Sequence, residues 1–225
     1  MKRKKPIMAI DGPVSSGKST VAKLVAEKLG FCYIDTGAMY RVITLKSLKN
    51  KIDLKDEKSL IKMAKNTKIK FKEGKKLKVF MDGTEVTDEI RNPLVSKNTS
   101  DIADSVGVKK ILIKLQQKMG KNGGVVLEGR DIGSLVFPDA EFKFYIDASR
   151  DKRAKRRYKE LLNKGMKQDF ETVRQDLTKR DERDVNRSFG ALKLVKDAKK
   201  IDTTNLNIDE VVNIIVNEVK KGVSK

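Results

Sequence analysis

The chain has 225 residues, enough for one α/β domain with a sizeable core and a small inserted subdomain. Its one cysteine excludes internal disulfides and cysteine-based zinc sites, and because no apolar run approaches the length of a membrane span, we expect a cytoplasmic protein. A formal charge of +20 suggests phosphate-bearing or nucleic-acid partners, although lysine on solvated helix faces is the commoner explanation. Histidine is absent, which favours chemistry without a general base of near-neutral pKa, such as phosphoryl transfer onto a phosphate.

Residues 7–29 predict a strand, a glycine-rich loop and a helix. The apolar run IMAI ends at Asp11, and GPVSSGKS at residues 12–19 fits the phosphate-binding pattern G-x-x-x-x-G-K-[ST]. Backbone N–H groups of such a loop surround phosphates, while Lys18 would reach the β- and γ-phosphates and the Ser19 hydroxyl would hold Mg²⁺. The pattern therefore predicts an ATP-type site formed by Gly12, Pro13, Val14, Ser15, Ser16, Gly17, Lys18, Ser19 and Thr20.

The next segments predict a short strand, two helices and then a change of period. Cys32 lies in the apolar stretch FCYI of the predicted strand, so we expect its thiol to be buried. Helices are expected from about residue 40 to 48 and around residues 60–63. Within residues 67–91, alternating apolar and polar residues are separated by the turn signals Glu73-Gly74 and Asp82-Gly83, which predicts an antiparallel meander. A meander cannot continue a parallel core, so we assign it to an inserted subdomain.

Strands and helices alternate through the rest of the chain. Helical periodicity covers about residues 93–119 and 151–182, and apolar strands are expected near residues 125–127, 142–147 and 200–202. Asn207 and Glu210 fit a capping box at the start of a terminal helix. The fold class expected is α/β, a P-loop NTPase-type parallel sheet of about five strands flanked by helices, with the small antiparallel insert.

Arginines paired with carboxylates form a second group of candidate residues. Gly129-Arg130-Asp131 follows a buried strand, at the carboxyl edge where ligands of α/β sheets bind. The run RDERDVNR at residues 180–187 holds three arginines and three acids, and Arg153, Arg156 and Arg157 form a third basic group. A salt-bridged surface helix is an equally good account of Arg156.

Three segments resemble signatures of the bacterial cytidylate kinase family: DTGAMYR at residues 35–41, EGRDIG at 128–133 and RDERDVNR at 180–187. They occur in the family's order, and FPDA at 137–140 and IDTT at 201–204 extend the likeness over nearly the whole chain. The resemblance implies a monomeric kinase that transfers the γ-phosphoryl group of ATP to CMP or dCMP with Mg²⁺, without a membrane or a stable nucleic-acid partner. It also implies a core at about 1–36, 105–152 and 168–225, an NMP-binding insert at about 37–104, and a mobile lid at about 153–167.

By this resemblance, Arg41, Arg130 and Arg187 clamp the acceptor phosphate. Guanidinium groups suit that role because they match phosphate bidentately and stay charged at any relevant pH. Ser100 and Asp131 would read the base, since a carboxylate accepts from the exocyclic amine of cytosine but faces an oxygen in uracil.

The remaining roles complete the expected site. Arg180, Asp184 and Thr36 would lie at the sugar, and the lid residues Arg153 and Arg157 would bind ATP. The candidate catalytic residues are Lys18, Arg130, Asp131 and Arg187. The candidate CMP-binding residues are Thr36, Arg41, Ser100, Lys109, Arg130, Asp131, Arg180, Asp184 and Arg187.

The sequence departs from the family pattern at four places. Lys109 stands where the family usually has an arginine, Glu128 replaces an aspartate, Ser134 replaces a threonine, and residues 191–194 lack prolines. Two alternatives stay open. One is a P-loop kinase for UMP, dTMP or an alcohol, with Asp131 as a base; the other is a basic RNA-binding NTPase, against which the 5% aromatic content argues.

Overall fold

The computed structural model describes residues 3–72, 74 and 77–223, which form two compact units. The first unit contains the chain up to residue 33 and from residue 122 onward, and the second contains residues 34–121. The predicted turn at Glu73 lies outside the described residues. None of the helices in the described ranges is long and apolar enough to cross a membrane.

The larger sheet has five strands in the order β2-β6-β1-β7-β8. The strands are β1 (Ile7–Asp11), β2 (Cys32–Asp35), β6 (Val125–Gly129), β7 (Phe142–Asp147) and β8 (Lys199–Asp202). Central strand β1 pairs in parallel with β6 and β7, and β7 pairs in parallel with β8. The predicted five-stranded parallel sheet is therefore confirmed.

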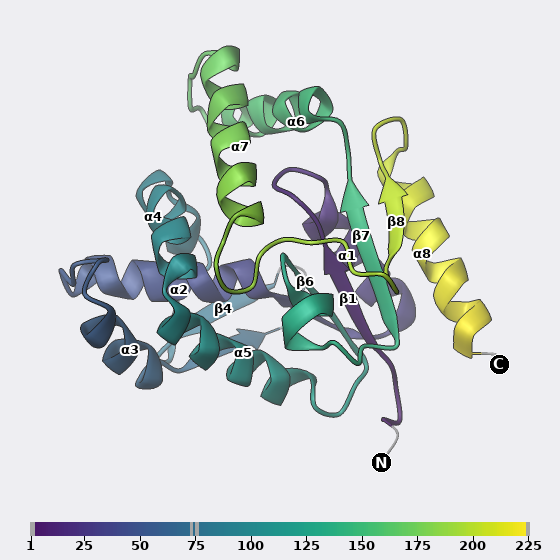
Figure 1. The fold of residues 1–225 in the computed structure, drawn as a ribbon, viewed down its shortest axis with the longest axis horizontal. Helices are drawn as coiled ribbons and strands as arrows, with labels where there is room; N and C mark the ends of the chain where they lie inside the picture. Colours follow the sequence, from purple (N-terminus) through teal and green to yellow (C-terminus); the bar gives the residue numbers. More distant parts are fainter. Residues whose placement is uncertain (1–2, 73, 75–76, 224–225) are drawn as a thin grey trace. The chain divides into compact units, whose positions relative to one another are not determined.

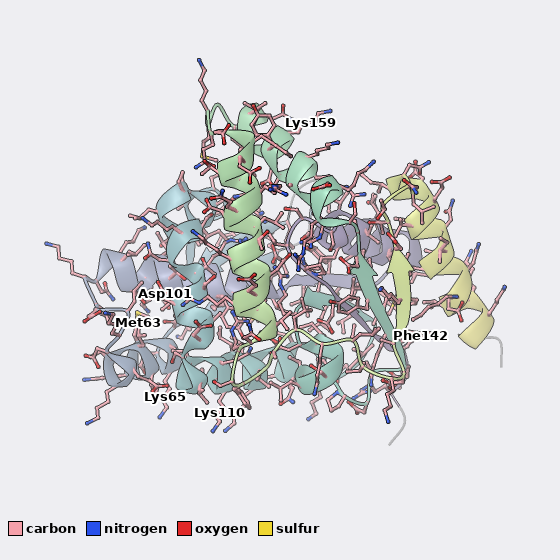
Figure 2. The ribbon with its side chains drawn as sticks, turned by 45° about the horizontal axis from the view of Figure 1, so that its top comes forward. Met63, Lys65, Asp101, Lys110, Phe142 and Lys159 are labelled. Carbon is pink, nitrogen blue, oxygen red and sulfur yellow. The ribbon has the colours of Figure 1, made fainter. Side chains whose placement is uncertain are left out.

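One face of this sheet packs on α1 (Lys18–Leu29) and α8 (Ile208–Val223). Met8 and Ile10 of β1 point into this core, where apolar residues of both helices meet them, as the two-residue period of a strand requires. Phe142, labelled in Figure 2, packs against the same core. A Cβ atom at Gly222 would lie 2.7 Å from the Phe142 ring, so glycine lets α8 approach β7 closely.

The expected burial of Cys32 is wrong, because the residue is exposed. It begins β2, which lies at the edge of the sheet, and only the last two residues of this strand are buried. The apolar neighbours of Cys32 in sequence therefore did not indicate a core position.

Two helices follow β7 where the sequence predicted one helical region. They are α6 (Arg150–Asn163) and α7 (Phe170–Val185), which pack against each other. Gly165, with φ of 72°, continues the chain in the left-handed conformation just after α6 ends. Figure 1 shows β7 entering α6 at the same end of the sheet as the loop that joins β1 to α1.

The predicted capping box at the start of α8 is confirmed. The Asn207 side-chain oxygen accepts from the Glu210 N–H at 3.0 Å, and the Glu210 carboxylate accepts from the Asn207 N–H at 2.7 Å. Both bonds satisfy N–H groups that the helix itself leaves unpaired.

We expect Asn207→Ala to lower the free energy of unfolding by about 1 kcal/mol, because one N–H group of α8 loses its acceptor. Urea unfolding measures the change, and exposed Asn205, two residues earlier, provides the matched control Asn205→Ala. Equal stability of the Asn207 variant and the wild-type protein would contradict the contribution assigned to this cap.

The second unit contains a small antiparallel sheet in the order β3-β4-β5, as predicted. Its elements in chain order are α2 (Thr36–Lys49), α3 (Glu57–Lys65), β3 (Ile69–Lys72), β4 (Lys78–Met81), β5 (Thr84–Glu85), η1 (Glu89–Arg91), α4 (Pro93–Asp104) and α5 (Val106–Gly120). Asp82 and Gly83 join β4 to β5 with positive φ values of 52° and 93°. Both values match the hairpin turn that an Asp-Gly pair favours.

The second unit extends to residue 121, and α5 packs on α3 within it. A Cβ atom at Gly107 would lie 2.3 Å from Ile61 Cδ1, so glycine permits the close approach of the two helices. The helical region predicted at residues 93–119 is divided at Ser105, whose hydroxyl accepts from the Val108 N–H and begins α5. Lysines of this unit such as Lys65 and Lys110, labelled in Figure 2, are exposed.

Candidate active site

The loop from residue 12 to 17 joins β1 to α1 and depends on two glycines. A Cβ atom at Gly12 would lie 2.0 Å from the Ile146 carbonyl oxygen, so only glycine allows the loop to pass β7 this closely. Gly17 precedes α1 with φ of 93°, a left-handed conformation that other residues rarely adopt. Each of the two glycines of the motif is therefore required by the backbone geometry of this chain.

Lys18 is the buried cation of this loop, with 6% of its surface exposed. Its Nζ donates to the Pro13 carbonyl oxygen at 2.9 Å. Burial and the positive charge of Arg130 lower the pKa of Lys18 to about 7. The buried Ser16 hydroxyl has no hydrogen-bond partner in the described part of the chain. An ammonium group with one neutral acceptor and an unsatisfied hydroxyl both fit a phosphate ligand.

Glu128, at the end of β6, lies beside the first turn of α1. Its Oε1 accepts from the Ser19 hydroxyl at 2.6 Å and from the Tyr33 hydroxyl at 3.2 Å. A hydroxyl and a carboxylate supply the oxygen ligands that Mg²⁺ prefers. Among the described residues, no group of three or more acidic, cysteine or histidine side chains could hold a metal ion. Ser19 and Glu128 would supply two oxygen ligands to an ion whose other ligands are water and phosphate.

Asp11 connects the start of the phosphate loop to the segment that follows Arg130 and Asp131. Its two carboxylate oxygens accept from the N–H groups of Ile132 and Gly133, at 2.9 and 2.8 Å. Burial raises the pKa of Asp11 to about 7, although both hydrogen bonds act in the opposite direction. Asp11 therefore holds the residues that directly follow Arg130 and Asp131 at the end of β1.

Arg130, Asp184 and Arg187 form a group that we call the arginine cluster. Arg130 Nε donates to Asp184 Oδ2 at 2.7 Å, and Arg187 Nη2 donates to Asp184 Oδ1 at 3.0 Å. Burial raises the pKa of Asp184, but the charges of Arg130 and Arg180 outweigh it and the pKa falls to about 2. Ionised Asp184 thus holds two of the predicted phosphate-binding guanidinium groups together.

The lid arginines have different surroundings. Buried Arg153 pairs with Asp181 at 2.6 Å and donates to the Val14 carbonyl oxygen at 3.2 Å. Arg157 pairs with Glu160 one turn along α6, at 2.8 Å. Arg156, which the sequence left undecided, donates to the Ser16 carbonyl oxygen at 3.1 Å. Two arginines of α6 therefore contact the backbone of the phosphate loop.

The other predicted CMP-binding residues belong to the second unit. Thr36 and Lys109 are buried, whereas Arg41 and Ser100 are partly exposed. Asp35 caps α2 by accepting from the Ala38 N–H at 2.8 Å and also pairs with Arg91 at 3.2 Å. This cap fixes the start of the helix that carries Thr36 and Arg41.

A family profile described as cytidylate kinase matches residues 8–221. The chain belongs to the cytidylate kinase family. The cytidylate kinases of Desulforamulus reducens and Pediococcus pentosaceus are each 48% identical to it, over 96% of this chain and 97% and 96% of their own lengths. The cytidylate kinase of Clostridioides difficile is 46% identical over 95% of this chain and 97% of its own. The resemblance predicted from the signature segments is confirmed.

Solved structures agree with this kinase at the level of the fold. Shikimate kinase from Bacteroides thetaiotaomicron has a TM-score of 0.50 and 10% identity, covering 96% of this chain and 98% of its own. An uncharacterized protein from Eubacterium ventriosum has a TM-score of 0.53 and 16% identity, covering 97% of this chain and 99% of its own. At such identities the likeness supports the P-loop kinase fold alone.

Sequence reasoning about this cytidylate kinase left Arg156 undecided and missed four residues that contact the site: Asp11, Tyr33, Glu128 and Thr203. Asp11 is the last residue of β1 and Glu128 the second-to-last residue of β6, so a position near the carboxyl end of a strand could have indicated both. The contacts of Arg156 and Thr203 join residues 47 apart in sequence, and no local pattern predicts them.

Proposed function

We propose that this cytidylate kinase transfers the γ-phosphoryl group of ATP to CMP or dCMP, giving ADP and CDP or dCDP, within pyrimidine nucleotide metabolism. The observation that carries the proposal is the position of the arginine cluster relative to the phosphate loop. Asp11, before the loop, and Gly129, before Arg130, are paired residues of adjacent parallel strands. The phosphate loop, which would bind ATP, and the arginine cluster, which would bind the acceptor phosphate, therefore follow neighbouring strands at the carboxyl end of the sheet.

The reaction needs no general base, because a phosphate monoester is largely ionised at pH 7. An oxygen of the CMP phosphate forms a bond to the γ-phosphorus, while the bond from that phosphorus to the β–γ bridging oxygen breaks and its electrons remain on ADP. The protein then has to position both reactants in line and stabilise negative charge. Lys18 and the arginine cluster supply positive charge on the two sides of the transferred group.

The acceptor contacts are proposed from the family motifs. Arg41, Arg130 and Arg187 bind the acceptor phosphate. The sugar lies at Thr36, Arg180 and Asp184, and the base at Ser100, Lys109 and Asp131. Asp131 selects cytosine because its carboxylate accepts a hydrogen bond from the exocyclic amine, at the position where uracil carries an oxygen.

Mg²⁺ is proposed as the cofactor, held by Ser19 and Glu128. When bound with ATP, the ion would neutralise charge on the β- and γ-phosphate oxygens. The hydrogen bond of 2.6 Å from the Ser19 hydroxyl to the Glu128 carboxylate supports this assignment, since it brings two oxygen ligands side by side. We also propose a cytoplasmic monomer without a stable nucleic-acid partner, as the family resemblance implies.

A substrate panel tests the function. We expect rapid ADP release from Mg-ATP with CMP and dCMP, at least about 100-fold slower release with UMP, and little with dTMP, AMP or GMP. Asp131→Ala should abolish the preference for CMP over UMP, and omission of Mg²⁺ should stop turnover.

Each other outcome has a distinct meaning. Equal rates with CMP and UMP in the wild-type protein would contradict the role of Asp131 but not the kinase. No turnover with any monophosphate, together with ATP hydrolysis stimulated by RNA, would contradict the kinase and favour the nucleic-acid-dependent alternative.

A further inference from the structure

Two elements outside the phosphate loop hold one of its carbonyl groups. Arg156 Nη1, from α6, donates to the Ser16 carbonyl oxygen at 3.1 Å. Thr203, which follows β8 and is 2% exposed, places its hydroxyl 3.2 Å from the same oxygen. Arg156 also donates to Thr203, at 3.1 Å to the hydroxyl and at 2.8 Å to the carbonyl oxygen. The Thr203 hydroxyl also lies 3.0 Å from the Asp147 carbonyl oxygen, so it is shared between β7 and the loop. Ser16, Arg156 and Thr203 thus form a hydrogen-bonded group that the end of β7 anchors.

This contact determines where the next N–H group points. In a trans peptide the C=O and N–H bonds are antiparallel, and the described chain contains no cis peptide bond. Because the Ser16 oxygen faces Thr203 and Arg156, the Gly17 N–H points away from them. Glycine has almost no steric preference between peptide orientations, so this peptide needs an external contact to remain in one of them.

A second loop carbonyl is held from the same helix. Arg153, three residues before Arg156 and therefore on the same side of α6, donates to the Val14 carbonyl oxygen at 3.2 Å. Arg153 is itself fixed by Asp181 and by the Ala148 carbonyl oxygen. Helix α6 therefore contacts the loop at two carbonyl groups rather than at one.

We propose that Thr203 and Arg156 are positioning residues for ATP: they orient the Ser16–Gly17 peptide so that the Gly17 N–H is available to a phosphate oxygen. The inference rests on the proposed binding of ATP by this loop. It assigns to both residues an effect on the affinity for the polyphosphate and none on the affinity for the base or for CMP. Both residues act on the Ser16 carbonyl oxygen, Thr203 with its hydroxyl and Arg156 with its guanidinium group.

Calorimetric titration with two probes, ATP and inorganic tripolyphosphate, tests the proposal. Thr203→Val keeps the shape of the side chain but removes the hydroxyl, and we expect about tenfold weaker binding of both probes. Arg156→Met should weaken both by a similar factor, and Thr203→Ser should restore wild-type affinity. The double variant should be little weaker than either single variant, because both residues act on one oxygen.

Two matched controls lie close by. Thr204 bonds Asp202 and the Ser149 N–H, and Arg150 is an exposed arginine of α6, so Thr204→Val and Arg150→Met should bind both probes as the wild type does. The KM for CMP should stay within twofold in every variant, and thermal unfolding identifies any variant that fails to fold.

The possible results distinguish failure of the positioning role from failure of the proposed function. Weaker ATP binding with unchanged tripolyphosphate binding would overturn the proposal, because the residues would then act on the nucleoside. Unchanged binding of both probes by folded Thr203→Val and Arg156→Met would overturn it as well. A wild-type protein that binds neither probe would instead contradict the proposed function.

Discussion

Lys18→Met is expected to lower kcat by about 1,000-fold or more, with little change in the KM for CMP. The ammonium group of Lys18 is buried in the loop and has the Pro13 carbonyl oxygen as its acceptor. In the proposed complex, negative charge on the β- and γ-phosphates gives Lys18 a far stronger partner, and this charge shifts towards the β–γ bridging oxygen as the bond breaks. Methionine fills similar space without the charge, so positioning is retained and transition-state stabilisation is lost.

The stability of this variant distinguishes lost chemistry from lost folding. The pKa of Lys18 is about 7 in the folded chain, whereas the ordinary pKa of a lysine, 10.5, applies in the unfolded chain. Between these values the unfolded chain binds a proton that the folded chain lacks, so this residue makes stability rise with pH across that window. At pH 7 the buried charge opposes folding, and we expect Lys18→Met to unfold at the same or a higher temperature.

Steady-state kinetics and thermal unfolding at pH 7 and 9 measure both effects. Lys23→Met, on an exposed position of the same helix, is the matched control and should behave as the wild type does. A folded Lys18→Met protein with kcat within tenfold of the wild type would contradict the role assigned to this lysine.

The parts of this fold that depend on neighbouring residues could be predicted from the sequence. Three features of residues 7–29 depend only on residues within one strand or one helical turn, so the sequence pattern reveals them. They are the apolar run before Gly12, the glycines of the loop and the helical period of α1. The Asp82-Gly83 hairpin and the Asn207 cap are equally local. Each has a backbone requirement that few residue types satisfy.

The parts that depend on distant residues could not be predicted in this way. Asp11 carries no motif of its own, and its partners lie more than 120 residues away in sequence. Arg156 stands beside Arg157 in a charged helix, and only the packing of α6 near the loop distinguishes a backbone contact from a surface ion pair. Cys32 looked buried because its neighbours are apolar, yet strand order decides which residues lie at an edge.

Arg130→Met is the second substitution with a large expected effect. We expect kcat/KM for CMP to fall about 1,000-fold, because in the proposed complex the acceptor phosphate loses a bidentate cation that also stabilises developing charge. The KM for ATP should change by less than threefold. Arg130→Lys should lose less, about tenfold to 100-fold, since an ammonium group keeps the charge but not the planar fork.

The variant also tests how the arginine cluster is held together. Arg130 helps to lower the pKa of Asp184 from its ordinary value of 3.8 to about 2. The stability that this ionised carboxylate provides is therefore fully present above pH 3.8, and it is lost as the pH falls towards 2. Without Arg130 the folded-state pKa rises, and unfolding temperature should fall less steeply between pH 4 and pH 2.5 than in the wild type.

Arg174, an exposed arginine of α7 that pairs with Glu171, supplies the control Arg174→Met, which should match the wild type in kinetics and in acid stability. An Arg130→Met protein that keeps kcat/KM for CMP within tenfold would contradict the phosphate clamp. A loss of activity with an unchanged pH dependence of stability would retain the clamp but contradict the electrostatic coupling of Arg130 to Asp184. Normal activity in Arg130→Lys alone would mean that charge, and not the fork geometry, is what the acceptor phosphate requires.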